Sequence, residues 1–295
     1  MKPFAIIFLG SLAFWGCTQP ADVELSRDGY ETDLEVRAVE VPDTNLILPE
    51  VDSTGVLADV FLTVKGVMLI SDVTHEAGDQ IVNTSFALVF VSDSTVRDMA
   101  GRMIGYSGID LGTVSLNGQP MVRLAHRVVL RRLLLPDTAL VRGYEYLANL
   151  TGLYRPGELY TWSFSSPGFG SRSESILAPT RVQVQSPPVI GQGVVERTKD
   201  LELLWRGGQG TMSIIISTFD PATRKTRPLL ELRSRANSGR ALLPAKILQQ
   251  LPRFQRHFIF TFVLANRREF GPTLNTSARV LVQAASIVNR YVELR

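Results

Sequence analysis

The segment SDVTHEAGDQ, at positions 71–80, contains the densest group of side chains that could bind a metal ion. Asp72, Glu76 and Asp79 offer carboxylate oxygens, and His75 lies among them. Oxygen ligands gathered in one loop suit a hard cation, so the segment is a weak candidate for a calcium site. The spacing does not match an EF-hand loop, and polar hairpin loops of this composition are common. An ordinary turn without metal is therefore the favoured interpretation.

A second segment, SFSSPGFGSRS, gathers hydroxyl side chains from Ser163 to Ser173. A serine nucleophile needs a base within hydrogen-bond reach, and many hydrolases place it in a Gly-x-Ser-x-Gly turn between a strand and a helix. The segment lacks that pattern. A loop is therefore favoured over a catalytic site.

Cysteine and histidine limit the chemistry further. The chain has one cysteine, Cys17, and three histidines, His75, His126 and His257. The histidines are far apart in the sequence, so no paired metal motif is present, and one cysteine can form neither an internal disulfide nor a cysteine-based zinc site. We therefore expect no cofactor and no enzymatic activity.

Arginine becomes frequent after position 185, with few carboxylates to balance it. Arg233, Arg235 and Arg240 flank the turn sequence NSG and could bind an anionic polymer such as envelope polysaccharide. Because the arginines alternate with core residues and do not form one block, solvated strand faces are the alternative. No recognition helix or stacking motif accompanies them, so we expect no nucleic-acid partner.

The first residues have the layout of a secretory signal. Met1 and Lys2 precede an apolar run at 3–15, which is shorter than the roughly 20 residues of a membrane-spanning helix. Gly16 and Cys17 follow at once. This arrangement resembles the bacterial lipoprotein signal. The resemblance implies a signal peptide at 1–16, a lipid on Cys17 and a place in the cell envelope, at the outer membrane. An ordinary cleaved signal peptide is the alternative.

Residues 17–54 are acidic, with only Arg27 and Arg37 as basic residues. Such a segment buries too little apolar surface to offset its loss of chain entropy, so the sequence predicts a flexible tether at 17–54. The alternative is an acidic edge strand at 34–41, where apolar residues alternate with polar ones.

From Val56 onward, apolar residues recur with a period of two, which is typical of half-buried strands. The first strand is predicted at 56–70, and Asn117-Gly118 and Pro156-Gly157 have the composition of tight turns. Further strands are predicted at 84–91, 111–118, 127–135, 144–150, 159–166 and 180–186. In one segment, 93–105, apolar residues are three and four positions apart instead, which predicts a short helix. Its apolar residues are Val96, Met99, Ala100 and Met103.

Prolines and glycines at 185–193 interrupt this periodicity and predict an exposed domain boundary. A short helix is predicted near Pro244, and further strands at 200–208, 211–219, 256–265, 278–284 and 287–294. The order of these segments resembles the immunoglobulin-like sandwich modules of bacterial surface lipoproteins. The predicted fold is all-β, with two antiparallel immunoglobulin-like β-sandwich domains in tandem, at 55–186 and 187–295, and one or two short helices.

The expected function is therefore that of a non-enzymatic envelope lipoprotein. It would bind or scaffold another envelope component, either an anionic polysaccharide or a protein. One alternative is a hydrolase of envelope polymers, with its site at 72–79 or 163–173. Another is an accessory subunit of an envelope or secretion complex, held by strand addition at the edge of a sandwich.

Overall fold

The computed structural model describes most of the chain after the predicted signal peptide. The described residues are 34–39, 51–57, 60–130, 138–166, 170–220, 225–234, 237–270 and 279–295. Cys17, the signal peptide at 1–16, Arg235 and much of the predicted tether lie outside this set, so the predictions about them stay predictions. Within the described residues, no helix is long and apolar enough to cross a membrane.

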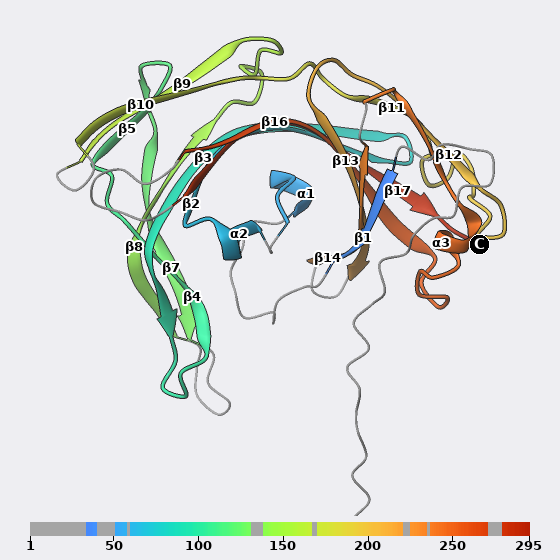
Figure 1. The fold of residues 1–295 in the computed structure, drawn as a ribbon, viewed down its shortest axis with the longest axis horizontal. Helices are drawn as coiled ribbons and strands as arrows, with labels where there is room; N and C mark the ends of the chain where they lie inside the picture. Colours follow the sequence, from blue (N-terminus) through green and yellow to red (C-terminus); the bar gives the residue numbers. More distant parts are fainter. Residues whose placement is uncertain are drawn as a thin grey trace, which may run out of the picture.

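Strands dominate the described part of the chain (Figure 1). Three helices of four residues each accompany them: α1 (Val51–Thr54), α2 (Val60–Thr63) and α3 (Ala245–Leu248). The strands of the first half are β1 (Leu34–Ala38), β2 (Gly66–Ala77), β3 (Gln80–Arg97), β4 (Met103–Gly108), β5 (Thr113–Leu116), β6 (Gln119–Pro120), β7 (Val122–Leu130), β8 (Thr138–Asn149), β9 (Leu159–Ser166), β10 (Gly170–Leu177) and β11 (Gln183–Ser186). Those of the second half are β12 (Leu201–Arg206), β13 (Thr211–Asp220), β14 (Lys225–Ser234), β15 (Arg240–Leu243), β16 (His257–Phe270) and β17 (Val280–Glu293). The all-β fold with short helices predicted from the sequence is confirmed.

One ten-stranded sheet, here called the inner sheet, runs through the whole molecule in the order β1-β14-β13-β16-β17-β2-β3-β8-β7, with β4 paired to the end of β3. It curves like an arch, and α1 and α2 lie on its concave side (Figure 1). Two smaller outer sheets, β10-β9-β5-β6 and β11-β12-β15, cover its convex side. Each outer sheet and the part of the inner sheet beneath it form a sandwich.

A separate hydrophobic core fills each sandwich. Trp162 of β9 packs with Tyr146 of the inner sheet in the first core, and Trp205 of β12 packs with Phe262 in the second. These aromatic side chains are almost fully buried. The period-two alternation in the sequence therefore identified the residues that face these cores.

The inner sheet is continuous across the predicted domain boundary. β17 pairs in parallel with β2, from the Val280–Gly66 pair to the Arg290–Glu76 pair. The boundary at 187 therefore divides the inner sheet, and it also divides the second outer sheet, because β11 lies before it and pairs with β12. Pro187 is buried and its carbonyl accepts a 2.7 Å hydrogen bond from Arg290, so the expectation of an exposed junction is wrong at this residue. Gln185, Gly191 and Gln192, in the same stretch, are exposed. Whether 55–186 and 187–295 fold independently stays a prediction.

The segment before β2 differs from the predicted strand at 56–70, because the first strand of this region begins only at Gly66. Val56, Leu57 and Val64 are buried against the concave face of the inner sheet. Gly55 makes the reversal at the end of α1 with φ +63°, where a Cβ atom would lie 2.6 Å from Val263. The alternating apolar residues therefore belong to a folded segment that packs on the sheet.

Part of the predicted tether at 17–54 is also structured. β1 pairs with β14 from Leu34 to Ala38, which matches the alternative of an acidic edge strand. α1 occupies 51–54. The tether prediction is therefore wrong for these two segments, because they find pairing partners and buried surface on an inner sheet that is distant in sequence.

The predicted helix at 93–105 is wrong as well, because the ends of β3 and β4 form a hairpin there. Asp98 accepts hydrogen bonds from the backbone N–H groups of Ala100, at 2.9 Å, and Arg102, at 2.8 Å. Gly101 adopts φ +78° in the turn. An aspartate side chain that caps backbone groups in this way favours a turn over a helix interior. The apolar residues with helical spacing therefore lie on two strands and in the turn between them.

The two predicted turns and the predicted helix near Pro244 are confirmed, whereas the two strands predicted at 278–284 and 287–294 form one strand, β17. Asn117 and Gly118 have φ values of +48° and +78° in the turn between β5 and β6. Gly157 has φ +77° in the turn before β9. α3 follows Pro244, as the sequence indicated.

Candidate functional site

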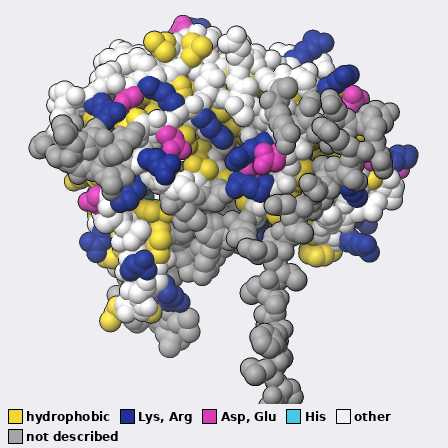
Figure 2. Space-filling view, in the orientation of Figure 1, with side chains coloured by type: hydrophobic (Ala, Val, Ile, Leu, Met, Phe, Trp, Pro, Cys, Tyr) yellow, Lys and Arg dark blue, Asp and Glu magenta, His cyan; other side chains and the backbone are white. Residues whose placement is uncertain are grey.

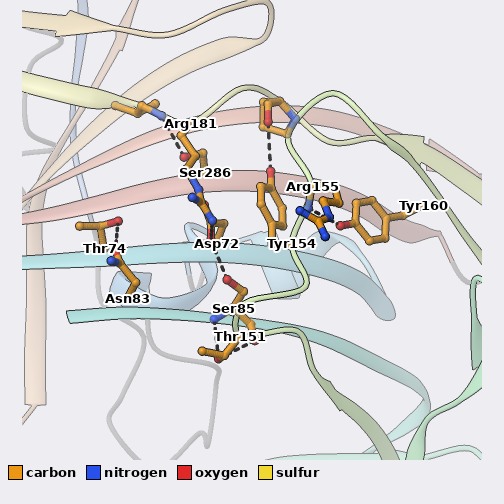
Figure 3. A network of polar contacts seen from close by, with 12 residues as sticks. Asp72, Thr74, Asn83, Ser85, Thr151, Tyr154, Arg155, Tyr160, Arg181 and Ser286 are labelled. Atoms are coloured by element: carbon orange, nitrogen blue, oxygen red, sulfur yellow. Dashed lines mark hydrogen bonds and ion pairs between the residues drawn. The ribbon is translucent and has the colours of Figure 1, made fainter.

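Asp72 is the centre of a polar network that connects the inner sheet to the segment between β10 and β11 (Figure 3). The buried carboxylate of Asp72, on β2, accepts a 2.6 Å hydrogen bond from the hydroxyl of Ser85 on β3. It also accepts a 2.7 Å hydrogen bond from Arg181, which lies between β10 and β11. The hydrogen bond to Asp72 raises the pKa of Arg181. The arginine charge therefore neutralises the buried carboxylate.

Two tyrosines support the same segment from the first sandwich. Tyr154 donates a 3.1 Å hydrogen bond to the carbonyl of Pro179, and Tyr160 accepts a 2.8 Å hydrogen bond from the backbone N–H of Arg155. Their rings stack with centroids 6.1 Å apart. Burial raises the pKa of both phenols, so both stay protonated at neutral pH. These contacts therefore hold the segment that connects the two outer sheets against the inner sheet.

The structure does not bring the candidate metal ligands together. Glu76 forms a 2.6 Å ion pair with Arg290, and Asp79 is beyond it at the hairpin tip, 3.5 Å from Gln192. His75 lies on the opposite, concave face, 3.4 Å from Asn289. Among the described residues, no three His, Cys, Asp or Glu side chains gather closely enough to bind a metal ion. The carboxylates of Asp72 and Glu76 instead serve as partners of arginines.

The Asp72 network also lacks the parts of a hydrolase site. Ser85 donates to Asp72, and no histidine belongs to the network drawn in Figure 3, so this serine has no general base there. Elsewhere in the described chain, His126 lies 3.2 Å from Glu145 and packs against the ring of Phe90. His257 is exposed at the start of β16. The Asp72 network is therefore a structural joint.

The serine-rich segment forms a hairpin of β9 and β10. Its serines and threonines alternate with inward-facing residues, so the outward positions at 113–115, 161–165 and 171–175 carry hydroxyl groups, and the next outward positions, Leu159 and Leu177, are exposed and apolar. We call this surface the hydroxyl face. It consists of Thr113 and Ser115 on β5, Thr161, Ser163 and Ser165 on β9, and Ser171, Ser173 and Ser175 on β10.

The strand register places these hydroxyls in rows across the outer sheet. Ser165 is opposite both Thr113 and Ser171, and Ser163 is opposite both Ser115 and Ser173. The hydroxyls of Ser165 and Ser171 are 3.0 Å apart, and those of Thr161 and Ser175 are 2.7 Å apart. A shallow depression of about 480 Å³ lies over this part of the sheet. Its lining consists of Thr113, Ser115, Ser163, Phe164, Ser165, Ser171, Arg172 and Ser173.

The hydroxyl face was missed in the sequence, because 163–173 was interpreted as a loop although its first residues belong to the strand predicted at 159–166. The available signal was the alternation in TWSFS and SRSES, in which each hydroxyl residue is two positions from the next. That period is the period of a strand. It indicates a regular surface and gives no support for a nucleophile elbow.

The predicted arginine site is divided between two surfaces. Arg233, on β14, forms a 3.1 Å ion pair with Glu231, whereas Arg240 is exposed on β15 of an outer sheet. Leu232 and Ala241, their sequence neighbours, both point into the core between these sheets. Arg233 and Arg240 therefore point in opposite directions, away from that core, and Arg235 lies outside the described residues. Figure 2 likewise shows basic side chains distributed singly and in small groups over this view of the molecule.

Comparisons with known proteins do not identify a family for this chain. No family model matches the chain, and no curated protein matches it. Among solved structures, the chain is similar to "Crystal structure of DIP-gamma IG1+IG2", at 11% identity over 78% of this chain and 95% of that chain, with a TM-score of 0.19. A TM-score this low means that the two folds do not superpose as wholes, so this likeness carries no argument about function.

Proposed function

We propose that this chain is a non-enzymatic binding module of the bacterial cell envelope. In this proposal a lipid on Cys17 holds it at the outer membrane, and the hydroxyl face binds a neutral, hydroxyl-rich polysaccharide. The supporting observation is the hydroxyl face itself, in which eight serines and threonines occupy adjacent outward positions of three neighbouring strands, with exposed Leu159 and Leu177 at one end. The anchor rests on the sequence around Gly16 and Cys17.

The chemistry of the hydroxyl face suits such a ligand. Each hydroxyl can donate one hydrogen bond and accept two, so the contacts between Ser165 and Ser171, or between Thr161 and Ser175, leave further capacity for a ligand. Neighbouring strands are about 4.8 Å apart, which repeats the donors and acceptors at a fixed interval. A polymer of sugar units presents hydroxyls in the same repeated manner. Because no ion pair is involved, binding should depend little on salt.

The test is retention of the purified protein on immobilised neutral and anionic polysaccharides. Ser163→Ala with Ser165→Ala removes two hydroxyls and should weaken retention about thirtyfold, since each lost neutral hydrogen bond costs about 1 kcal/mol. Ser94→Ala with Thr95→Val changes two exposed residues of β3 and serves as the control. Binding that falls steeply with salt, or that survives the double serine change, would contradict the proposed site.

The anchor needs its own experiment. Mass spectrometry of membrane-extracted protein should show an amino-terminal peptide that begins at Cys17 and carries acyl chains. Cys17→Ser should release the protein from the membrane, because stable attachment needs the combined burial of several chains. An unmodified mature protein that begins elsewhere would contradict the lipoprotein proposal and leave the polysaccharide test unaffected.

A further inference from the structure

In the described part of the chain, the inner sheet ends at β7. Among the described residues, β7 pairs only with β8, so the other edge of β7 presents unpaired backbone N–H and C=O groups. The residues from Val122 to Ala125 are all exposed, and Val122 and Leu124 have 60% and 38% of their surface accessible. An exposed edge strand with apolar residues can pair with a strand of another protein.

β7 has few of the features that normally prevent such pairing. Its sequence, VRLAHRVVL, contains neither proline nor lysine. The one irregularity is a shift of register between Ala125 and Arg127. Val122 and Leu124 share one face, because alternate residues of a strand point the same way. The first four residues of β7 therefore form a regular edge with an apolar side.

The surroundings of this edge are basic. Arg127 on β7 and Arg142 on β8 are charged, and no carboxylate of the described residues forms an ion pair with either. Arg123 pairs with Asp110, and Glu145 is already the partner of His126. Arginines without carboxylate partners favour an acidic ligand beside them.

We infer that β7 accepts an extended strand of a partner protein in which apolar and acidic residues alternate. The backbone of that strand would continue the inner sheet, its apolar side chains would contact Val122 and Leu124, and its carboxylates would lie near Arg127 and Arg142. A second copy of this chain is a poor partner, because pairing of two β7 strands would bring arginines together. This site is on the inner sheet and is separate from the hydroxyl face.

A designed peptide tests the inference with the full mature chain. The probe is a decapeptide of alternating valine and glutamate, and the controls are the valine–lysine peptide and a valine–glutamate peptide with N-methyl groups on alternate residues. The N-methyl groups remove backbone donors along one edge and leave the side chains in place. Fluorescence anisotropy should show binding of the unmodified valine–glutamate peptide alone. Hydrogen exchange should then show new protection of the amides of β7.

Two variants locate the contact. Leu124→Lys places a charge on the apolar side, and Arg127→Glu reverses the basic charge, so each should weaken peptide binding about fivefold. Leu159→Lys and Arg206→Glu change exposed residues on the outer sheets and should leave it unchanged. Thermal unfolding checks that all four variants remain folded. Retention on polysaccharide should be the same for Leu124→Lys and Arg127→Glu as for the parent, which separates this site from the proposed function.

Four results would overturn the inference. The valine–lysine or N-methylated peptide could bind equally well, or Leu124→Lys and Arg127→Glu could bind like the parent. Bound peptide could protect β1 or an outer sheet but not β7. Finally, protection of β7 that rises with protein concentration in the absence of peptide would identify a second copy as the partner.

Discussion

The strands at the two edges of the inner sheet, β1 and β7, differ in length, charge and exposure. At one edge, β1 comes from a segment distant in sequence, pairs with β14 and buries Leu34 in the second core. At the other edge, β7 pairs only with β8 among the described strands, and its first residues are exposed on both faces. Among the described strands, β1 and β7 are therefore both edge strands with one unpaired side. β1 is short and carries Glu35 and Arg37, whereas β7 exposes Val122 and Leu124, which makes the β7 edge the better place to look for a partner strand.

Ion pairs reinforce the pairing of β1 with β14. Glu231 of β14 has only 2% of its surface accessible, and its carboxylate accepts hydrogen bonds of 2.7 and 3.1 Å from Arg37 of β1. Arg233 adds an ion pair at 3.1 Å. A buried carboxylate is costly when its partners are removed, so β1 is held by a charge interaction as well as by backbone hydrogen bonds.

The largest loss of stability is expected in β8, the strand that pairs with β7. β8 crosses close to the end of β4, and Gly143 has φ +86° there, so a Cβ atom would lie 1.7 Å from the carbonyl oxygen of Gly108. Gly143→Ala should lower the free energy of unfolding by more than about 3 kcal/mol in urea denaturation. Gly152 has φ +77° but nothing within 4 Å, so Gly152→Ala should cost only about 1 kcal/mol. Equal costs would show that the crossing is not tightly packed.

The second largest loss of stability is expected at the edge formed by β1. Glu231→Gln removes the charge that binds Arg37 and should cost about 3 kcal/mol, with loss of hydrogen-exchange protection in β1 and not in β7. Glu269→Gln is the control, because Glu269 is exposed and its ion pair with Arg279 is 3.5 Å long. It should cost less than about 0.5 kcal/mol. Loss of protection at both edges would mean that they do not behave separately.

Between the edges, Arg290 connects the two halves of the chain. It forms hydrogen bonds with Glu76, the carbonyl of Val184 and the carbonyl of Pro187. Arg290→Lys keeps the charge but loses most of these bonds, which should cost about 2 kcal/mol and start proteolytic cleavage within 185–193. Arg295→Lys, at an exposed position, should have no such effect. Unchanged resistance at 185–193 in the Arg290 variant would show that other contacts hold the junction.

The comparison of edges also shows what the sequence could predict. Alternation identified the buried side of β9 and β16 because the period of a strand is local information. It could not identify the parallel pairing of β17 with β2, since nothing near Val280 indicates Gly66 as its partner. The acidic composition around Arg37 favoured a tether, because Glu231, the residue that forms an ion pair with Arg37, is far away in the sequence and nothing near Arg37 indicates it.

The candidate site shows the same limit. The spacing of Asp72, Glu76 and Asp79 suggested shared oxygen ligands, but strand geometry and two distant arginines separate them. Arg233 and Arg240 are close in sequence, yet the turn between them carries the chain from one sheet to the other. Only the alternation of serines indicated a surface feature of the folded protein. It could be recognised as such only where the segment was treated as a strand.

The smallest effect is expected at α1, which packs on the concave side of the sheet that joins both edges. Asp52 has a carboxylate oxygen that is buried without a hydrogen-bond partner, and burial raises its pKa. A raised pKa in the folded state means that the contribution of this group to stability is fully present below its unfolded pKa, near 4, and is lost as pH rises through the folded value. Asp52→Asn should therefore stabilise the protein at pH 7, by less than about 1 kcal/mol, and should have no such effect at pH 3. Urea denaturation at both pH values measures this difference, with Asp79→Asn at the exposed hairpin tip as the control. A stabilisation that is the same at pH 3 would show that the charge of Asp52 is not its cause.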